Sequence, residues 1–258
     1  MDLGLKGRSA IVCASSRGLG KACALSLARE GVAVVVNGRD ENTLSATRDE
    51  IADLSGSKVT AVVADVSTQE GQAALLAACP QPDILINNNG GPPPKDFRSL
   101  DRAAMLEGVI QNMVTPIELI QRVTPHMIGQ RFGRIVNITS LSVKMPLLGL
   151  DLSSGARAGL TAFMAGPARE LAQHNITVNN ILPGMFDTDR LRNTTKRMAE
   201  MQGKTIEDVA GQRRSTVPAR RFGEPSELGE LCAFLCGMQA GYITGQSFLV
   251  DGGLFNAV

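Results

Sequence analysis

The sequence predicts an α/β fold: a single-domain doubly wound parallel sheet flanked by helices. Two observations predict it. Short continuous apolar runs alternate with amphipathic stretches along almost the whole chain, and a glycine-rich turn follows the first of these runs directly. Strands that are buried on both faces of a parallel sheet read as continuous runs of Val, Ile and Leu. A chain of 258 residues accommodates this fold as one domain, residues 1–258.

The apolar runs define the expected strands, and the stretches between them define the helices. The expected strands are Ser9–Cys13, Val32–Val36, Lys58–Val63, Ile84–Ile86, Arg134–Ile138, Thr177–Leu182 and Ser247–Val250. The first helix is expected over Gly18–Glu30, and a later one over Ser226–Cys236, which Pro225 opens. Ser67 and Glu70 predict a capping box for a helix that runs to Ala78. This order of strand, helix and strand predicts right-handed crossovers.

Two segments interrupt the alternation. Gly90–Pro94 follows a strand directly and is too rich in proline for a helix. Residues 186–222 are long and rich in Arg, Met and Gly. Ligands of open α/β sheets bind outside the carboxyl ends of the strands, so both segments are expected to wall a substrate cleft. A solvated insertion is the alternative for 186–222, and its length argues against it.

The composition excludes several classes of protein. The net charge of +1 gives no sign of a nucleic-acid partner. No apolar run reaches the ~20 residues that cross a bilayer, and Met1–Gly7 lacks the pattern of a signal peptide. The five cysteines show no disulfide spacing, and two histidines make a histidine-built metal site unexpected. We therefore expect a cytoplasmic protein without metal, membrane or nucleic acid, in which Cys232 and Cys236 are buried free thiols.

The turn after the first strand predicts a dinucleotide site. A glycine-rich turn that opens a helix lets the backbone approach a pyrophosphate, and the helix N-terminus offers free N–H groups. The strand before the turn and the helix after it are the context that such a motif requires. The candidate cofactor-binding residues in this turn are Ala14, Ser16, Arg17, Gly18, Leu19 and Gly20.

The end of the second strand predicts the choice of cofactor. Proteins that bind NAD usually place an acidic residue there to accept from the ribose 2′-hydroxyl. This chain has Asn37 and then Arg39, with no carboxylate before Asp40. A guanidinium suits a phosphate because its planar fork makes paired charge-assisted hydrogen bonds. Arg17 and Arg39 therefore predict NADP(H), the alternative being that either is a solvated surface residue.

Taken together, the motifs resemble those of the short-chain dehydrogenase/reductase family, which has the Rossmann fold. The turn is similar to that family's Thr-Gly-x-x-x-Gly-x-Gly, with Cys13 and Ala14 in the first two places. The resemblance implies that Asp65 and Val66 hold the adenine ring, and that a helical Asn112 serves the active site. It further implies a cofactor role for Asn88, Asn89, Gly90, Pro183, Gly184, Phe186 and Thr188. Within the family, 3-oxoacyl-[acyl-carrier-protein] reductases are the most similar, which implies a homo-oligomer, a tetramer.

The catalytic motif of that family is only partly present. The family uses a Ser, a Tyr that passes a proton to the substrate oxygen, and a Lys four residues after the Tyr. Ser140 matches the first, but Ser153 stands at the Tyr position and Arg157 at the Lys position. An aliphatic hydroxyl is a far weaker acid than a phenol, whose pKa is about 10. We therefore expect Ser153 to hydrogen-bond a substrate or a water, and Arg157 to bind ribose hydroxyls and supply positive charge.

Lys144 is the candidate replacement for the missing acid. It follows Ser140 by four residues, in a loop that leaves the carboxyl end of a strand. Desolvated in the cleft, its ammonium could donate the proton; the equally weighted alternative is that it points into water. The expected reacting centre thus comprises Asn112, Ser140, Lys144, Ser153 and Arg157.

These motifs predict an NADP(H)-dependent oxidoreductase with a non-standard proton donor. It would interconvert a small-molecule carbonyl compound, with a 3-oxoacyl compound or acyl thioester as candidates, and a secondary alcohol. One alternative is a redox-inactive NADP(H)-binding sensor or partner subunit; another is a lyase or isomerase. The basic residues between 190 and 221 suggest an anionic substrate, although a solvated helix face is the more common explanation for such a charge run. They are Arg190, Arg192, Lys196, Arg197, Arg213, Arg214, Arg220 and Arg221.

Overall fold

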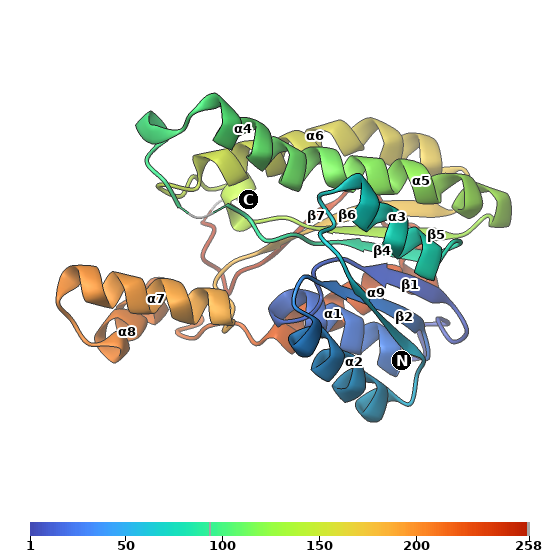
Figure 1. Ribbon diagram of the computed structural model, residues 1–258, viewed down its shortest axis with the longest axis horizontal. Helices are drawn as coiled ribbons and strands as arrows, with labels where there is room; N and C mark the ends of the chain where they lie inside the picture. The colour runs from blue at the N-terminus through green and yellow to red at the C-terminus, as the bar shows by residue number, and fades with distance from the viewer. Residues whose placement is uncertain (93, 257–258) are drawn as a thin grey trace.

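The computed structural model describes residues 1–92 and 94–256, and these form a seven-stranded parallel sheet with helices on both faces (Figure 1). The strand order is β3-β2-β1-β4-β5-β6-β7. The chain therefore reverses direction across the sheet between β1 and β4, which makes this the point where a ligand is expected. The predicted doubly wound parallel sheet is confirmed.

Every predicted strand is present, with ends that differ from the prediction by one or two residues. The strands are β1 (Ser9–Val12), β2 (Ala33–Gly38), β3 (Val59–Val63), β4 (Ile84–Asn87), β5 (Gly133–Ile138), β6 (Ile176–Pro183) and β7 (Ser247–Val250). The central strands β4 and β5 are buried at every position. Cover on both faces explains why these strands read as unbroken apolar runs rather than as alternating ones.

The helices lie in two layers. They are α1 (Gly18–Arg29), α2 (Glu41–Ser55), α3 (Gln69–Ala78), α4 (Arg102–Val109), α5 (Thr115–Gln130), α6 (Asp151–Ala172), α7 (Asp189–Gln202), α8 (Ile206–Thr216) and α9 (Pro225–Cys236). One apolar core joins α1, α2 and α9 to the sheet through residues such as Leu27, Leu44 and Leu228. A second core joins α3, α5 and α6 to the opposite face, through residues such as Leu75 and Leu119. Figure 1 shows these two layers on either side of the sheet.

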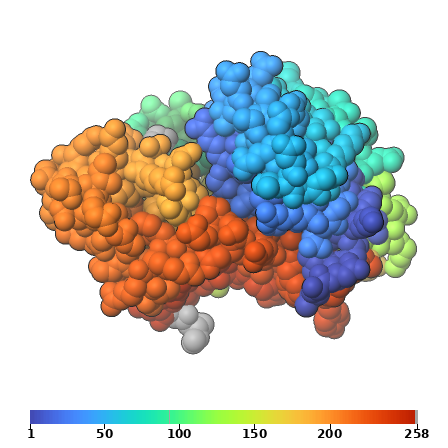
Figure 2. All heavy atoms as spheres, turned by 90° about the horizontal axis from the view of Figure 1, so that it is seen from below, coloured from blue at the N-terminus to red at the C-terminus, as the bar shows by residue number. Residues whose placement is uncertain are grey.

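The segment 186–222 is more regular than its composition suggested. It contains α7 and α8, each with a threonine N-cap, where we expected an irregular cleft wall. These two helices project from one end of the molecule (Figure 1) and form a distinct lobe in the space-filling view (Figure 2). Because they follow β6, the lobe lies at the carboxyl edge of the sheet.

One predicted cap was placed a residue too early. Thr68, not Ser67, caps α3, since its hydroxyl accepts from the N–H of Gly71 at 3.0 Å. The hydroxyl of Ser67 instead donates to Asp65. The Ser-x-x-Glu spacing suggested a capping box, but Asp65 lies closer to Ser67 than the helix amides and binds its hydroxyl.

Other expectations can be compared with the structure directly. All five cysteines are buried and unpaired, as expected for Cys232 and Cys236. The described helices include none that combines the length and apolarity needed to cross a membrane. Of the segment Gly90–Pro94, the described residues are not helical, and Pro93 lies outside the described residues. Ala257 and Val258, at the end of the expected domain, also lie outside them.

Candidate active site

The glycine-rich turn brings the backbone close to the N-terminus of α1. A Cβ atom on Gly20 would lie 2.4 Å from the carbonyl oxygen of Ala14, so only glycine fits there. Side chains cap the N-termini of α2, α3, α4, α7 and α8. The N-terminus of α1, after Arg17, has no side-chain cap. Its free N–H groups therefore suit an anionic group such as a pyrophosphate.

Asn37, near the end of β2, holds the glycine-rich turn in place through hydrogen bonds. It is buried, its Oδ1 accepts from the N–H of Ala14 at 3.2 Å, and its amide nitrogen donates to the carbonyls of Val62 and Ala64. The structure thus gives Asn37 a supporting position. Ser16 and Leu19 are half-buried in the same turn, and Leu19 packs against the core.

The two arginines predicted to bind a phosphate lie at the exposed end of this site. The guanidinium of Arg17 donates to the hydroxyl of Thr43 at 2.9 Å. Arg39 lies 3.7 Å from Asp65 and its side chain is 80% exposed. Asp40 caps α2 by accepting from the N–H of Thr43 at 2.8 Å. The hydroxyl of Thr43 also donates to this carboxyl group, and the hydroxyl and backbone hydrogen bonds together lower its pKa. The first carboxylate after β2 is therefore occupied by its own helix.

The loop after β4 joins two parts of the site. Asn88 donates to the carbonyl of Ala14 at 3.0 Å, which ties the loop to the glycine-rich turn. Asn89 donates to the carbonyl of Gln111 at 3.1 Å, which ties it to the π-helical turn Ile110–Val114. Gly90 is exposed, with nothing packed on the side where a Cβ atom would stand. Val66 is buried beside the loop, and Asp65 accepts two hydrogen bonds from Ser67.

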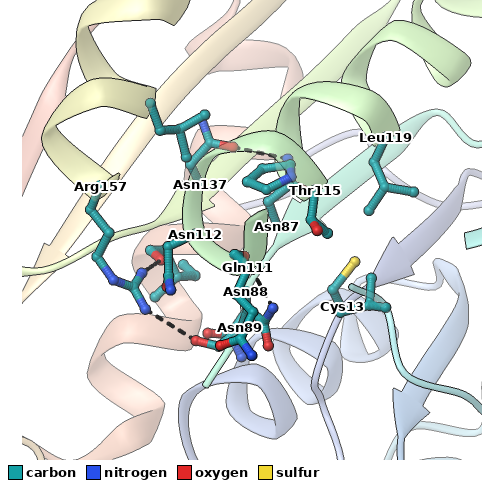
Figure 3. Close-up of a pocket in the computed structure, with 14 residues that line it drawn as sticks. Cys13, Asn87, Asn88, Asn89, Gln111, Asn112, Thr115, Leu119, Asn137 and Arg157 are labelled. Atoms are coloured by element: carbon teal, nitrogen blue, oxygen red, sulfur yellow. Dashed lines mark hydrogen bonds between the residues drawn. The ribbon is translucent and has the colours of Figure 1, made fainter. Parts of the chain in front are cut away.

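Arg157, on α6, is buried where the carboxyl ends of β4 and β5 meet that helix. Its Nη1 donates to the carbonyl of Ile138 at 2.7 Å, and its Nη2 donates to the carbonyl of Asn89 at 3.1 Å (Figure 3). Its Nε donates to the hydroxyl of Ser153 at 3.1 Å, one turn earlier on α6. Burial and, to a smaller extent, the charge of Arg190 lower the pKa of Arg157 to about 10. The side chain remains protonated at neutral pH, as expected.

The guanidinium of Arg157 has five N–H groups. Its three hydrogen bonds use one N–H on each of its three nitrogens. One N–H on Nη1 and one on Nη2 remain available to a ligand. The structure therefore leaves Arg157 able to bind ribose hydroxyls while it braces the site.

Asn112 lies in the π-helical turn between α4 and α5. Its amide nitrogen donates to the carbonyl of Gly108 at 3.2 Å, while its buried Oδ1 has no partner among the described residues. Asn87 Oδ1 and Thr115 Oγ1 are buried and unpartnered in the same way. All three residues line a cavity of about 20 Å³ next to Arg157, a volume that suits a single water. π-Helical turns within α-helices are frequent at functional sites.

A row of asparagines crosses the sheet beside this cavity, and sequence reasoning missed it. Asn87, Asn137 and Asn180 are paired in register on β4, β5 and β6. Their amides are linked, from Asn87 Nδ2 to Asn137 Oδ1 at 2.9 Å and from Asn137 Nδ2 to Asn180 Oδ1 at 3.1 Å. One signal in the sequence could have revealed this row: each of three successive apolar strands contains an asparagine. Figure 3 shows Asn87 and Asn137 side by side.

Ser140 and Lys144 lie in the segment after β5. The Ser140 hydroxyl caps the short 3-10 turn Leu141–Val143 by accepting from the N–H of Ser142 at 3.1 Å. Lys144 is exposed to solvent and does not line the cavity. Of the two positions considered for Lys144, the structure shows the exposed one, directly after the 3-10 turn. Tyr242 is fully exposed, and it precedes β7 rather than lying at the cavity.

The segment after β6 closes over the glycine-rich turn. A Cβ atom on Gly18 would lie 3.4 Å from Cγ2 of Thr188, and the Thr188 hydroxyl caps α7. Pro183 ends β6, Gly184 packs against Asp251, and Phe186 is buried. The predicted cofactor residues of this segment thus lie at the same edge of the sheet as the turn.

Sequence reasoning placed Arg190 in a general basic region and did not single it out. It is the second residue of α7, and its guanidinium lies over Gly91. A Cβ atom on Gly91 would lie 3.3 Å from Arg190 Nη2 and 3.1 Å from Ser153 Oγ. Two charged groups, Arg157 and Arg190, therefore flank Ser153.

Comparisons with known proteins agree with this geometry. A family model described as Enoyl-(Acyl carrier protein) reductase matches residues 13–255. The NADPH-dependent reductase BacG of Bacillus subtilis (strain 168) is 34% identical over 260 residues, which cover 97% of this chain and 99% of BacG. The 3-oxoacyl-[acyl-carrier-protein] reductase FabG of Aquifex aeolicus (strain VF5) is 32% identical, over 99% of this chain and 100% of FabG.

Solved structures extend the likeness to three dimensions. L-sorbose reductase from Gluconobacter frateurii, in complex with NADPH and L-sorbose, superposes with a TM-score of 0.95 at 27% identity, over 100% of both chains. YwfH, an NADPH dependent reductase involved in bacilysin biosynthesis, gives a TM-score of 0.91 at 31% identity, over 97% of this chain and 99% of YwfH. The chain belongs to the short-chain dehydrogenase/reductase family and resembles its 3-oxoacyl-[acyl-carrier-protein] reductases.

Proposed function

We propose that this protein is an NADP(H)-dependent oxidoreductase that interconverts a carbonyl compound and a secondary alcohol. The observation that carries the proposal is the uncapped N-terminus of α1, which meets a glycine-rich turn and two exposed arginines. Relatives and neighbours described as NADPH-dependent reductases, or solved with NADPH, support the same cofactor and the same class of reaction. A 3-oxoacyl compound or acyl thioester is a candidate substrate because FabG relatives are named for one.

The residues fit the cofactor along its whole length. Arg17 and Arg39 would bind the 2′-phosphate, and the carboxylate of Asp40 accepts from the N-terminus of α2 rather than from a ribose hydroxyl. The free amides of α1 would bind the pyrophosphate, and Pro183, Gly184 and Thr188 would hold the nicotinamide end. When bound, NADPH supplies the hydride.

Proton transfer falls to Ser153 in this proposal. Its hydroxyl would donate to the substrate oxygen, which becomes negatively charged as the hydride arrives. The Nε–H of Arg157 donates to Ser153 Oγ at 3.1 Å, and such a hydrogen bond stabilises the serine oxygen when it gives up its proton. Water from the open cleft then restores the hydroxyl. Ser140 would orient the carbonyl, and Asn112 would hold the π-helical turn beside it.

The remaining assignments follow from the family and the fold. We propose that 186–222, now seen as the lobe α7–α8, covers the substrate within a single domain. A homotetramer and a cytoplasmic location are further proposals that rest on the resemblance. The described chain offers no cluster of His, Cys, Asp or Glu that could hold a metal ion, so none is assigned a role.

A redox-inactive sensor or partner subunit is the second candidate. The observation that favours it is the lack of a phenol at the cavity, where Ser153 and Arg157 stand instead. Turnover with NADPH on a panel of ketones and 3-oxoacyl thioesters supports the enzyme. Tight NADPH binding with no turnover on that panel supports the sensor.

Cofactor titration tests the NADP(H) assignment separately from turnover. Calorimetric titration is expected to show a dissociation constant for NADPH at least about tenfold lower than for NADH, the advantage of charge-assisted contacts to one phosphate. Equal constants for the two cofactors would contradict the NADP(H) assignment, whatever the outcome of the turnover assay.

A further inference from the structure

The guanidiniums of Arg157 and Arg190 both lie near the Ser153 hydroxyl, and neither forms an ion pair with a carboxylate of the described residues. Arg157 donates to two backbone carbonyls and to Ser153. Arg190 takes part in no ion pair with the described residues. Two positive charges near Ser153, neither of them in an ion pair with the described residues, favour a negatively charged ligand.

Several neighbouring arginines of the lobe have partners of their own. Arg192 pairs with Asp187 at 2.8 Å, and Arg221 pairs with Glu227 at 2.6 Å. Arg214 pairs with Glu207, and Arg213 donates to the hydroxyls of Thr194 and Thr195. Each of these arginines has a partner within the lobe or next to it. Arg190 instead lies against Gly91, next to Ser153.

The position of Arg190 relative to the substrate follows from Gly91. A Cβ atom on Gly91 would approach both Ser153 Oγ, at 3.1 Å, and Arg190 Nη2, at 3.3 Å. The Ser153 hydroxyl and the Arg190 guanidinium therefore both pack against Gly91 and are close neighbours of one another. A group bound to Arg190 would stand within a few bonds of an oxygen bound to Ser153.

The electrostatics of the two arginines agree with this position. Arg190 is exposed to solvent as a residue, yet desolvation of its guanidinium lowers its pKa. Burial, and then the charge of Arg190, lowers the pKa of Arg157. Both shifts mean that the protein alone disfavours the positive charges, and a bound anion would relieve this cost.

We propose that the substrate of this site is an oxo acid, whose carboxylate Arg190 binds beside the reacting carbonyl. The planar fork of a guanidinium matches the two oxygens of a carboxylate. This inference rests on the proposed function, since it names the substrate class of the same site. It also gives the anionic-substrate hypothesis one specific residue in place of a charged surface.

The cofactor is the competing ligand for Arg190. Thr188, two residues earlier, touches the glycine-rich turn where the pyrophosphate is expected. The guanidinium of Arg190, however, lies at Gly91 and Ser153, next to the reacting centre. An experiment must therefore measure substrate preference and cofactor binding separately.

The test uses matched pairs of substrates and matched variants of the full-length protein. The probes are 2-oxo, 3-oxo and 4-oxo acids with four to ten carbons, each compared with its methyl ester, with NADPH as reductant. The variants are Arg190→Leu, Arg190→Lys and, as a control on the same helix, Arg192→Leu, which removes an arginine that Asp187 already pairs. Kinetics give kcat and KM, and calorimetry gives the NADPH dissociation constant.

We expect the native protein to prefer at least one acid over its ester by about tenfold or more in kcat/KM, the usual effect of a charge-assisted pair. Arg190→Leu should remove this preference by raising KM for the acid, while the NADPH constant stays within about twofold of the native value. Arg190→Lys should restore part of the preference, and Arg192→Leu should retain all of it. Equal use of acids and esters by the native protein would overturn the inference and leave the reductase standing. A tenfold loss of NADPH affinity in Arg190→Leu would also overturn it, by assigning Arg190 to the cofactor.

A binding assay keeps the inference separate from the proposed reaction. If no compound turns over, benzoate and benzamide are titrated into the protein loaded with NADP⁺. Benzoate binding that is lost in Arg190→Leu, with no benzamide binding, supports the carboxylate site even though the reductase proposal fails. Failure of benzoate to bind under these conditions overturns both.

Discussion

Arg157 donates a hydrogen bond from Nε to Ser153 Oγ at 3.1 Å, which links the two residues that the family resemblance aligns with a catalytic Lys and Tyr. We propose that each residue of this pair compensates for the other. A serine alone is a poor proton donor. A serine that accepts from a buried guanidinium has a stabilised anion, which makes it a better one.

Replacing Ser153 tests whether this pair serves the reaction. Ser153→Ala is expected to lower kcat by about 100-fold, the low end of the contribution of a general acid. NADPH binding should change little, because Ser153 lies at the reacting centre and the cofactor contacts lie elsewhere. Ser154→Ala is the control, since the Ser154 hydroxyl only donates to the carbonyl of Leu150 within the same helix. Unchanged turnover in Ser153→Ala would show that another group supplies the proton.

The second prediction concerns the structural role of Arg157. Arg157→Met would leave the carbonyls of Ile138 and Asn89 and the hydroxyl of Ser153 without their donor. Unsatisfied buried groups cost about 1–3 kcal/mol each, so we expect the free energy of unfolding to fall by about 3 kcal/mol. Urea denaturation measures it. Arg157→Lys keeps the charge but not the fork, and should recover only part of the loss. Full stability in Arg157→Met would mean that water replaces all three contacts.

The pH dependence of turnover is a third prediction. Burial lowers the pKa of Arg157 to about 10, and the protonated form is the one that can donate to Ser153. Because the active form is lost as pH rises through the folded pKa, kcat should fall on an alkaline limb near pH 10. The profile from pH 7 to 11 measures this, with circular dichroism over the same range to show that the protein stays folded. A flat profile in the folded protein would exclude titration of Arg157 in this range.

The sequence predicted the sheet and the cofactor turn because both depend on local patterns. Continuous apolar runs are visible in the sequence, and so is a turn such as Ala14–Gly20 between a strand and a helix. The arrangement of the candidate active site could not be predicted in the same way, because it depends on contacts between residues that are far apart in the sequence. The bracing of β4 and β5 by Arg157 and the approach of Arg190 to Gly91 join segments far apart in the chain.

The exposed position of Lys144 and the helices of the α7–α8 lobe were both hard to predict, because neither leaves a local pattern in the sequence. The outward position of Lys144 depends on the 3-10 turn that precedes it, and spacing from Ser140 did not reveal that turn. The α7–α8 lobe was missed because its helices are strongly polar, so an apolar periodicity did not mark them. Helices that project from the main body have less need of an apolar stripe.

The fourth prediction concerns Ala14, where the family has glycine. Its φ is +44°, a left-handed conformation that costs an alanine about 1 kcal/mol or more. Ala14→Gly should therefore raise the free energy of unfolding by about 0.5–1 kcal/mol, after allowing for the greater freedom of glycine in the unfolded chain. Ala22→Gly, in the middle of α1, is the matched control and should lower it by about 1 kcal/mol. A loss of stability in both variants would show that the Cβ of Ala14 makes packing contacts that outweigh the strain.

The last prediction separates the two cofactors at the end of β2. The side chain of Arg39 is 80% exposed, and its one ion pair with the described residues is a 3.7 Å contact with Asp65, so its guanidinium is free to turn towards a 2′-phosphate. Arg39→Leu should weaken NADPH binding by about fivefold to tenfold, a modest effect because solvent screens an exposed charge. It should leave NADH binding unchanged, since NADH has no phosphate at that position. Arg48→Leu is the control, because Arg48 is an exposed arginine on α2 that pairs with Asp49. Calorimetric titration of both cofactors against both variants gives four dissociation constants, each compared with that of the native protein. Equal weakening of NADPH and NADH binding by Arg39→Leu would place the guanidinium on the adenine or the ribose instead of the phosphate.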